Sequence, residues 1–108
     1  MKRNDDRVYR MKAEIIKAIA HPIRLAVLDS VQAGEKCVCD IAEEVGAERS
    51  NVSRHLSVLV KAGVLSCRKD GLNVFYKLRC ACVLDFLECA TRVLKQNVDE
   101  EVRILAKV

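Results

Sequence analysis

The feature that most restricts the fold of this chain is a glycine between two segments of helical apolar spacing. Apolar residues recur at helical intervals over residues 38–45, Gly46 follows, and the spacing resumes over residues 49–62 up to Gly63. Such periodicity predicts amphipathic helices, and a glycine permits a tight turn between them. Short helix, glycine turn and longer helix together predict a helix-turn-helix over residues 38–62.

A small β-hairpin is expected directly after this pair of helices. Two strand-like runs cover residues 64–69 and 73–79, and Asp70-Gly71 between them predicts the hairpin tip. Further amphipathic helices are predicted at residues 8–20, 22–33 and about 82–98, and the tail to residue 108 either extends the last helix or frays. This order predicts a mainly α fold, the winged helix-turn-helix, in a single domain of residues 1–108.

Composition limits the classes of protein that this chain can belong to. Hydrophobic residues make up 51% of 108 residues, enough for a core, but a core of this size is small and favours pairing with a second copy. The net charge of +4 is compatible with a polyanionic partner and equally with an ordinary surface. The sequence has no apolar run of about 18 residues and no apolar segment after its charged N-terminus, so we expect a cytoplasmic protein without a membrane helix.

The helix predicted at residues 49–62 begins with short polar and cationic side chains. Arg can bond guanine edges in two places, Asn can do so with adenine, and Ser is adaptable. The candidates for contact with the major groove of double-stranded DNA are Arg49, Ser50, Asn51, Ser53 and Arg54. His55 lies next to the apolar face, where we expect a role at the core edge or on a phosphate.

The predicted wing, residues 64–79, carries Arg68 and Lys69 close to its tip. A projecting cationic loop would contact the DNA backbone or the minor groove, which positions a protein without specifying sequence. The alternative is a solvated hairpin.

Six cysteines also need an explanation. Structural disulfides are rare in a reducing compartment, where clustered cysteines more often bind metal or sense redox state. Some cysteines could instead be small packing residues, and we expect this for Cys67.

The pair Cys37 and Cys39 is the first candidate thiolate site. Trivalent arsenic needs three sulfur ligands, and cadmium, lead or zinc needs three or four, so this pair supplies two. Residues i and i+2 of a helix point about 200° apart, so both thiolates reach one ion only if Cys37 precedes the helix or the first turn opens. Ion binding would then distort the helix that supports the DNA-reading helix, and we expect DNA affinity to fall.

The second candidate site comprises Cys80, Cys82 and Cys89. Cys80 and Cys82 bracket the predicted junction between strand and helix, where the backbone can bring two thiolates together. Cys82 and Cys89 share a helix face but lie about 10 Å apart along its axis, so Cys89 needs a partner from elsewhere, such as a second subunit. The alternatives are that Cys80 and Cys82 complete or form a metal site, or that Cys82 and Cys89 are core packing.

The sequence resembles the ArsR/SmtB family of small homodimeric metalloregulators over roughly residues 10–95. The segments that carry the resemblance are Ala20-His21-Pro22-Ile23-Arg24-Leu25, Cys37-Val38-Cys39-Asp40-Ile41-Ala42, Ser50-Asn51-Val52-Ser53-Arg54-His55-Leu56, and the wing from Gly63-Val64-Leu65 to Val74-Phe75-Tyr76. The resemblance implies a homodimer with the last helix at its interface. It further implies a repressor that binds an operator in its own promoter and leaves this operator when an ion binds. We expect the operator to be an inverted repeat.

The Cys-Val-Cys-Asp motif resembles the thiolate branches of this family, which sense arsenite, antimonite, cadmium or lead. Arsenite-sensing relatives often have a third cysteine where this chain has Ala42. The cadmium and lead branch completes its site with cysteines of an N-terminal arm, but residues 1–36 of this chain contain no cysteine. The remaining ligands are therefore unassigned. As(III) or Sb(III) is the favoured inducer, with Cd(II), Pb(II) or Zn(II) as alternatives.

Three other functions compete with ion sensing. A redox or persulfide sensor on the same fold would use a reversible disulfide. A DNA-binding module with incidental cysteines is another alternative. An enzyme is disfavoured, because two His and four Gly provide neither a nucleophile with its base nor a phosphate-binding loop.

Overall fold

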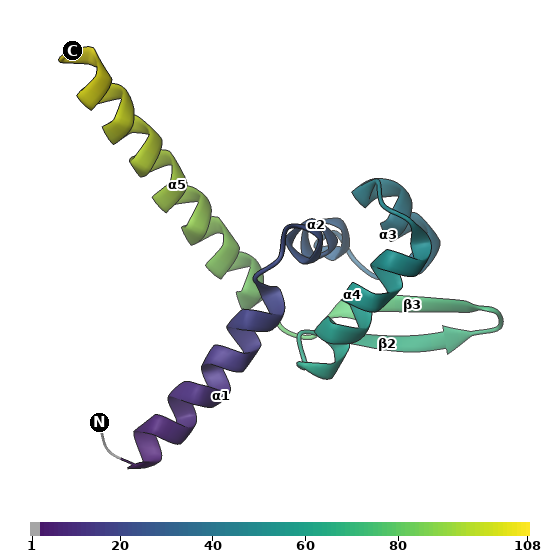
Figure 1. The fold of residues 1–108 in the computed structure, drawn as a ribbon. Coiled ribbons are helices and arrows are strands. Elements are labelled where there is room, and N and C mark those ends of the chain that lie inside the picture. The colour runs from purple at the N-terminus through teal and green to yellow at the C-terminus, as the bar shows by residue number, and fades with distance from the viewer. Residues whose placement is uncertain (1–2) are drawn as a thin grey trace.

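The computed structural model describes residues 3–108, which form five helices and three strands. In chain order these are α1 (Arg3–Ile19), α2 (Pro22–Val31), β1 (Lys36–Cys37), α3 (Val38–Val45), α4 (Arg49–Lys61), β2 (Leu65–Asp70), β3 (Asn73–Leu78) and α5 (Cys82–Ala106). Helices α2, α3 and α4 gather beside the hairpin, whereas α1 and α5 extend from them as two arms (Figure 1). The predicted winged helix-turn-helix fold is confirmed.

The hydrophobic core lies where α2, α3, α4 and the base of the hairpin meet. Its largest fully buried side chains are Leu28, Ile41, Leu56, Leu59, Leu65, Val27, Val31 and Val52. Burial of each such aliphatic side chain stabilises a fold by about 1.5–3 kcal/mol relative to exposure. The helix-turn-helix is therefore held by tertiary packing on a shared aliphatic core.

The ends of α2 and α3 follow from individual residues. Pro22 occupies the first turn of α2, and the Nδ1 atom of His21 accepts a hydrogen bond from the backbone N–H of Ile23 at 3.1 Å. Proline suits this position because its missing N–H would have no partner there. Gly46 ends α3 with φ 76°, a left-handed conformation that favours glycine, and so makes the predicted turn into α4.

The sheet contains a strand that sequence patterns did not predict. Its order is β1-β3-β2 and both pairings are antiparallel. The predicted hairpin is observed, with Asp70 opposite Asn73 at its tip. Strand β1 pairs Cys37 with Phe75. Two residues are too few for an alternating pattern, so only the tertiary structure reveals β1.

The two arms differ from the core in their burial. No residue of α5 is buried, and apolar side chains are exposed along both arms, including Val8, Met11, Ile15, Phe86, Val93, Leu94 and Val98. Helix α1 begins at Arg3, earlier than predicted, and α5 continues to Ala106, so the tail after residue 98 extends the last helix. Among residues 3–108 no helix is long and apolar enough to cross a membrane.

Candidate nucleic-acid interface and cysteine motifs

The first turns of α4 form a polar surface that faces away from the core. Arg49, Ser50 and Arg54 are exposed, and Asn51 and Ser53 are partly exposed. Arg54 Nη2 donates a hydrogen bond to Asn51 Oδ1 at 3.2 Å, which brings together a guanidinium and an amide on one helix face. The first turn of α4 contains no acidic residue, so its positive helix end is compatible with a phosphate.

His55 has a different position from these polar residues. Its Nδ1 atom accepts a hydrogen bond from Arg24 Nε at 3.1 Å, and its ring lies 4.4 Å from that of His21 between centroids. Arg24 Nη1 in turn donates to the carbonyl of Ala18 at 3.1 Å. Burial, followed by the positive charge of neighbouring groups, lowers the pKa of His55 below 6.5. The expected core-edge position is observed, and His55 links α4 to α2.

The two cations close to the wing tip, Arg68 and Lys69, are not equivalent. Arg68 donates Nη2 to Glu35 Oε1 at 2.6 Å and Nε to Glu35 Oε2 at 3.0 Å, and its guanidinium lies 4.8 Å from the ring centroid of Phe75. These hydrogen bonds raise the pKa of Arg68 and lower the pKa of Glu35. Lys69 is exposed, and alternation along a strand places it on the other face of β2. Lys69 therefore presents its charge to solvent, whereas that of Arg68 is paired.

Cys37 and Cys39 lie on either side of the start of α3. Cys37 is the residue before the helix, with an extended backbone (φ −79°, ψ 159°), and Cys39 is exposed in the first turn. Both thiols are free, and Cys37 is partly exposed. The expectation that Cys37 precedes the helix is confirmed. The i, i+2 geometry of a continuous helix therefore does not hold these two sulfurs apart.

The residue before Cys37 is anchored to α3. Lys36 Nζ lies 2.6 Å from Glu44 Oε1, and Glu44 also accepts a hydrogen bond from the hydroxyl of Ser30 in α2. The hydrogen bond from Lys36, with a further contribution from Ser30, lowers the pKa of Glu44. Val38, which follows Cys37, is only 5% exposed. The Cys37 backbone is therefore fixed from both sides.

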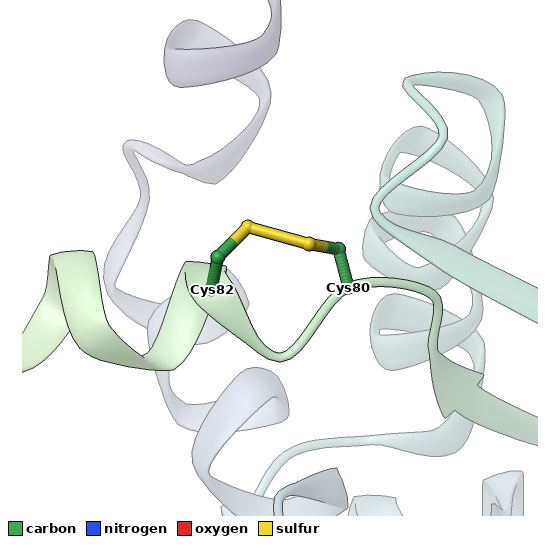
Figure 2. The surroundings of a disulfide bond; sticks show 2 residues. All are labelled: Cys80 and Cys82. Atoms are coloured by element: carbon green, nitrogen blue, oxygen red, sulfur yellow. A yellow bond between two sulfur atoms is a disulfide. The ribbon is translucent and has the colours of Figure 1, made fainter.

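Cys80 and Cys82 are linked by a disulfide (Figure 2). Their Cα atoms are 5.4 Å apart, within the usual range for a disulfide. Cys80 follows β3, Ala81 has a helical backbone (φ −66°, ψ −16°), and Cys82 is the first residue of α5. The expectation that this junction brings the two sulfurs together is confirmed. In this bonded form the pair has no thiolate to offer an ion.

The other two cysteines are exposed, and the expectation that Cys67 is a packing residue is wrong. Cys67 lies opposite Tyr76 on the hairpin, on a part of β2 that extends beyond the core. Cys89 is exposed on α5, so it does not pack in the core either. Within residues 3–108 no three His, Cys, Asp or Glu side chains are grouped as metal ligands would be. The α3 motif thus brings two thiols, and a third ligand has to come from rearrangement or a second chain.

Some residues of these sites have no signal in the sequence. Glu35 contacts Arg68, 33 positions away, and nothing in its neighbourhood distinguishes it from other charged residues. Glu44, near the end of α3, likewise contacts Lys36 of β1, eight positions before it. A search for opposite charges that flank the Cys37 motif could have suggested both acids but not their partners.

A core of three helices, a turn and a charged wing defines the class of winged helix-turn-helix DNA-binding proteins. Residues 21–66 match the family described as bacterial regulatory protein, arsR family. The sequence is 33% identical over 99 residues to the HTH-type transcriptional regulator Rv0081 of Mycobacterium tuberculosis (strain ATCC 25618 / H37Rv), covering 91% of this chain and 87% of that one.

Two further relatives extend the comparison. The arsenical resistance operon repressor of Staphylococcus xylosus is 33% identical over 91 residues, covering 84% of this chain and 80% of the repressor. The crystal structure of NolR from Sinorhizobium fredii superposes with a TM-score of 0.77 at 28% identity, covering 86% of this chain and 93% of NolR. The chain belongs to the arsR family and is a DNA-binding transcriptional regulator. That its relatives are transcriptional regulators argues against the enzyme alternative.

Proposed function

We propose that the chain is a homodimeric repressor that leaves its operator when a thiophilic ion binds Cys37 and Cys39. The observation that carries the proposal is the position of these two free thiols at the first turn of α3, the helix that packs beside α4. Arsenite or antimonite is the favoured inducer, and a relative is named an arsenical resistance operon repressor. Cadmium, lead and zinc are the alternative ions.

Operator binding is assigned to α4 and the wing. Arg49, Ser50, Asn51, Ser53 and Arg54 would face the major groove, since they form the polar surface of α4. The wing would add a backbone contact. Exposed apolar faces on α1 and α5 favour a second copy of the chain as their partner, because so much apolar surface is costly in water. A two-fold dimer would read an operator with inverted-repeat symmetry.

Release would follow from the geometry of the α3 motif. The thiolate is the form that binds soft ions. One ion that ligates both sulfurs would draw together Cys37, which precedes α3, and Cys39, in its first turn, and so shift the start of α3. Ile41 in α3 and Leu56 in α4 belong to the same buried cluster, so a shift of α3 reaches the DNA-reading helix. A coupling of about 1–3 kcal/mol is typical of such linked sites and changes DNA affinity by roughly 5- to 150-fold.

The test is a titration of the reduced, full-length protein bound to its operator with arsenite, then cadmium, then zinc. Ultraviolet absorption of thiolate–ion bonds reports ion binding, and fluorescence anisotropy of labelled DNA reports release in the same sample. We expect arsenite to produce both signals together. Absorption that rises while anisotropy stays constant would refute the coupling, and no absorption with any ion would refute the sensor.

A second candidate function is a thiol redox sensor, which the Cys80–Cys82 disulfide favours. Peroxide would oxidise the Cys82 thiolate to a sulfenic acid with loss of hydroxide, and the Cys80 thiol would then displace water to form the disulfide. Two thiols and one peroxide thus give one disulfide and two waters.

Peroxide added to the reduced protein–operator complex separates the two candidates. The redox function predicts release that dithiothreitol reverses, with free thiols falling from six to four. Cys80→Ser should abolish this response, and the control Cys67→Ser should keep it. Oxidation of the pair without any change in operator affinity would rule out the redox function and leave ion sensing as the proposal.

A further inference from the structure

The segment before the α3 motif is attached to the wing as well as to α3. Glu35 lies two residues before Cys37, and both of its carboxylate oxygens accept hydrogen bonds from Arg68 of β2. Paired carboxylate and guanidinium groups of this kind combine charge with fixed geometry. The contact spans 33 positions of the sequence, so it joins two elements that the chain connects only through the whole helix-turn-helix.

The sheet register places the sensor cysteine in the same row as this contact. Cys37 pairs with Phe75, and Phe75 pairs with Arg68 on its other side. Residues directly opposite each other in neighbouring antiparallel strands have side chains on the same face. The Arg68 guanidinium lies 4.8 Å from the Phe75 ring centroid, so Cys37, Phe75 and Arg68 form one continuous row with Glu35 at its edge.

Lys36, the residue after Glu35, contacts α3 instead of the wing. Alternation along a strand turns Lys36 away from the face of Cys37, and its Nζ lies 2.6 and 2.7 Å from the two carboxylate oxygens of Glu44 in α3. Consecutive residues therefore fasten the same short segment to the wing and to α3. A displacement of this segment at Cys37 would move both attachments.

We propose that Glu35 is a positioning residue, which with Arg68 transmits ion binding at Cys37 to the wing. While the thiols are free, the Glu35–Arg68 pair holds the hairpin against β1 in the orientation that binds DNA. Ion capture shifts Cys37, draws Glu35 away from Arg68 and releases the hairpin. Arg68 thus joins the wing to the sensor, and Lys69 is the wing cation that contacts phosphate. This inference rests on the proposed function, because it concerns the regulation of the same site.

The first test is a comparison of Glu35→Gln with the full-length wild type in the arsenite titration. Glu35→Gln keeps the shape of the side chain but removes its charge, so the factor by which arsenite weakens operator binding should fall about threefold to tenfold. Thiolate absorption should still report arsenite binding, because no sulfur ligand has changed. The arsenite affinity of the operator complex should rise, relative to that of the DNA-free protein, by the factor by which the coupling falls, because coupling between two sites is reciprocal. The matched control is Glu43→Gln, an exposed carboxylate of α3 outside this contact, which should respond like the wild type.

A double-mutant cycle shows whether the two residues act as one unit. Arg68→Gln should reduce the arsenite response as much as Glu35→Gln, and the double variant should add no further loss. The reversed pair Glu35→Arg with Arg68→Glu should restore part of the response.

The salt dependence of operator binding distinguishes the two wing cations. Lys69→Gln should lower the slope of log affinity against log salt by about 0.9 per chain, as expected for the loss of one phosphate contact. Arg68 acts only through the position of the hairpin, so the slope of Arg68→Gln should equal that of Glu35→Gln. A slope change in Arg68→Gln that Glu35→Gln does not share would show that Arg68 itself contacts phosphate and would overturn its assignment.

The outcomes separate this inference from the proposed function. A wild-type protein that stays on its operator in arsenite overturns both. Release of the same size in wild type and Glu35→Gln overturns the inference alone and leaves the sensor intact.

Discussion

Two Cys-X-Cys motifs of the same spacing lie at the same kind of place in this molecule, where a strand is followed by a helix. Cys37 and Cys39 flank the start of α3, and Cys80 and Cys82 flank the start of α5. The sulfurs of the first motif are free, whereas those of the second are bonded to each other. The spacing of two cysteines therefore does not determine whether their sulfurs are free or bonded. The conformation of the backbone between them determines this.

The middle residue and its neighbours account for the difference. Cys37 is extended and paired within the sheet, and the buried Val38 fixes the step into α3. At the second motif the middle residue, Ala81, precedes α5 and its side chain is exposed, so no buried side chain fixes the step between the two cysteines. A restrained pair resists direct bonding and is suited to an ion that bridges it, whereas an unrestrained pair is suited to a disulfide.

The largest expected effect is on ion-dependent release. Cys37→Ser with Cys39→Ser should leave operator affinity within about twofold with or without arsenite, because no coupling remains once the two thiolates are gone. Cys80→Ser with Cys82→Ser should retain the response of the wild type. Anisotropy titrations of labelled operator measure both. If Cys80→Ser with Cys82→Ser abolished release and Cys37→Ser with Cys39→Ser did not, the roles assigned to the two motifs would be wrong.

A smaller effect is expected on stability at the middle residue of each motif. Val38→Ala removes two methyl groups from a side chain that is 5% exposed and should lower the free energy of unfolding by about 1–3 kcal/mol. Ala81→Ser, at an exposed position, should change it by less than about 0.5 kcal/mol. Urea denaturation followed by circular dichroism, under reducing conditions, measures both. Equal losses would show that the two junctions are restrained alike.

The smallest expected effect is that of acid on the restraints of the first motif. Hydrogen bonds from Arg68 and Lys36 lower the pKa of Glu35 and Glu44, respectively, below 4.5. A carboxylate with a lowered pKa contributes stability that is present above its unfolded value near 4.5 and lost as pH falls through the lower folded value. Amide hydrogen exchange at β1, corrected for the intrinsic rate, should therefore accelerate below pH 4.5.

Residues 80–82 provide the internal control for this measurement, because no carboxylate anchors them in the structure of residues 3–108. Their exchange should change less than that of β1. Glu35→Gln with Glu44→Gln should remove most of the pH dependence at β1. A β1 segment whose protection stays constant as pH falls below 4.5, until the whole fold is lost, would contradict the role of these ion pairs.

The sequence predicted the helices and strands that a repeating apolar pattern encodes. It did not predict features that depend on a single tertiary contact. Helical spacing and Gly46 predicted α3, its turn and α4, and the Asp70-Gly71 pair predicted the hairpin. The end of α5 could not be fixed from the sequence, because residues 98–108 contain no glycine or proline that would mark the stop. Cys67 was expected in the core, but the hairpin carries it beyond the packed region.

The sequence by itself determined the winged helix-turn-helix, because apolar periodicity and turn residues act locally and agree with one another. It also determined which cysteines are close enough in the chain to act in pairs. Only the tertiary structure decided that Cys37 belongs to a strand, that Arg68 is held by Glu35 and that His55 is tied to Arg24. These are single contacts between residues more than 30 positions apart, and no local pattern encodes such a pairing.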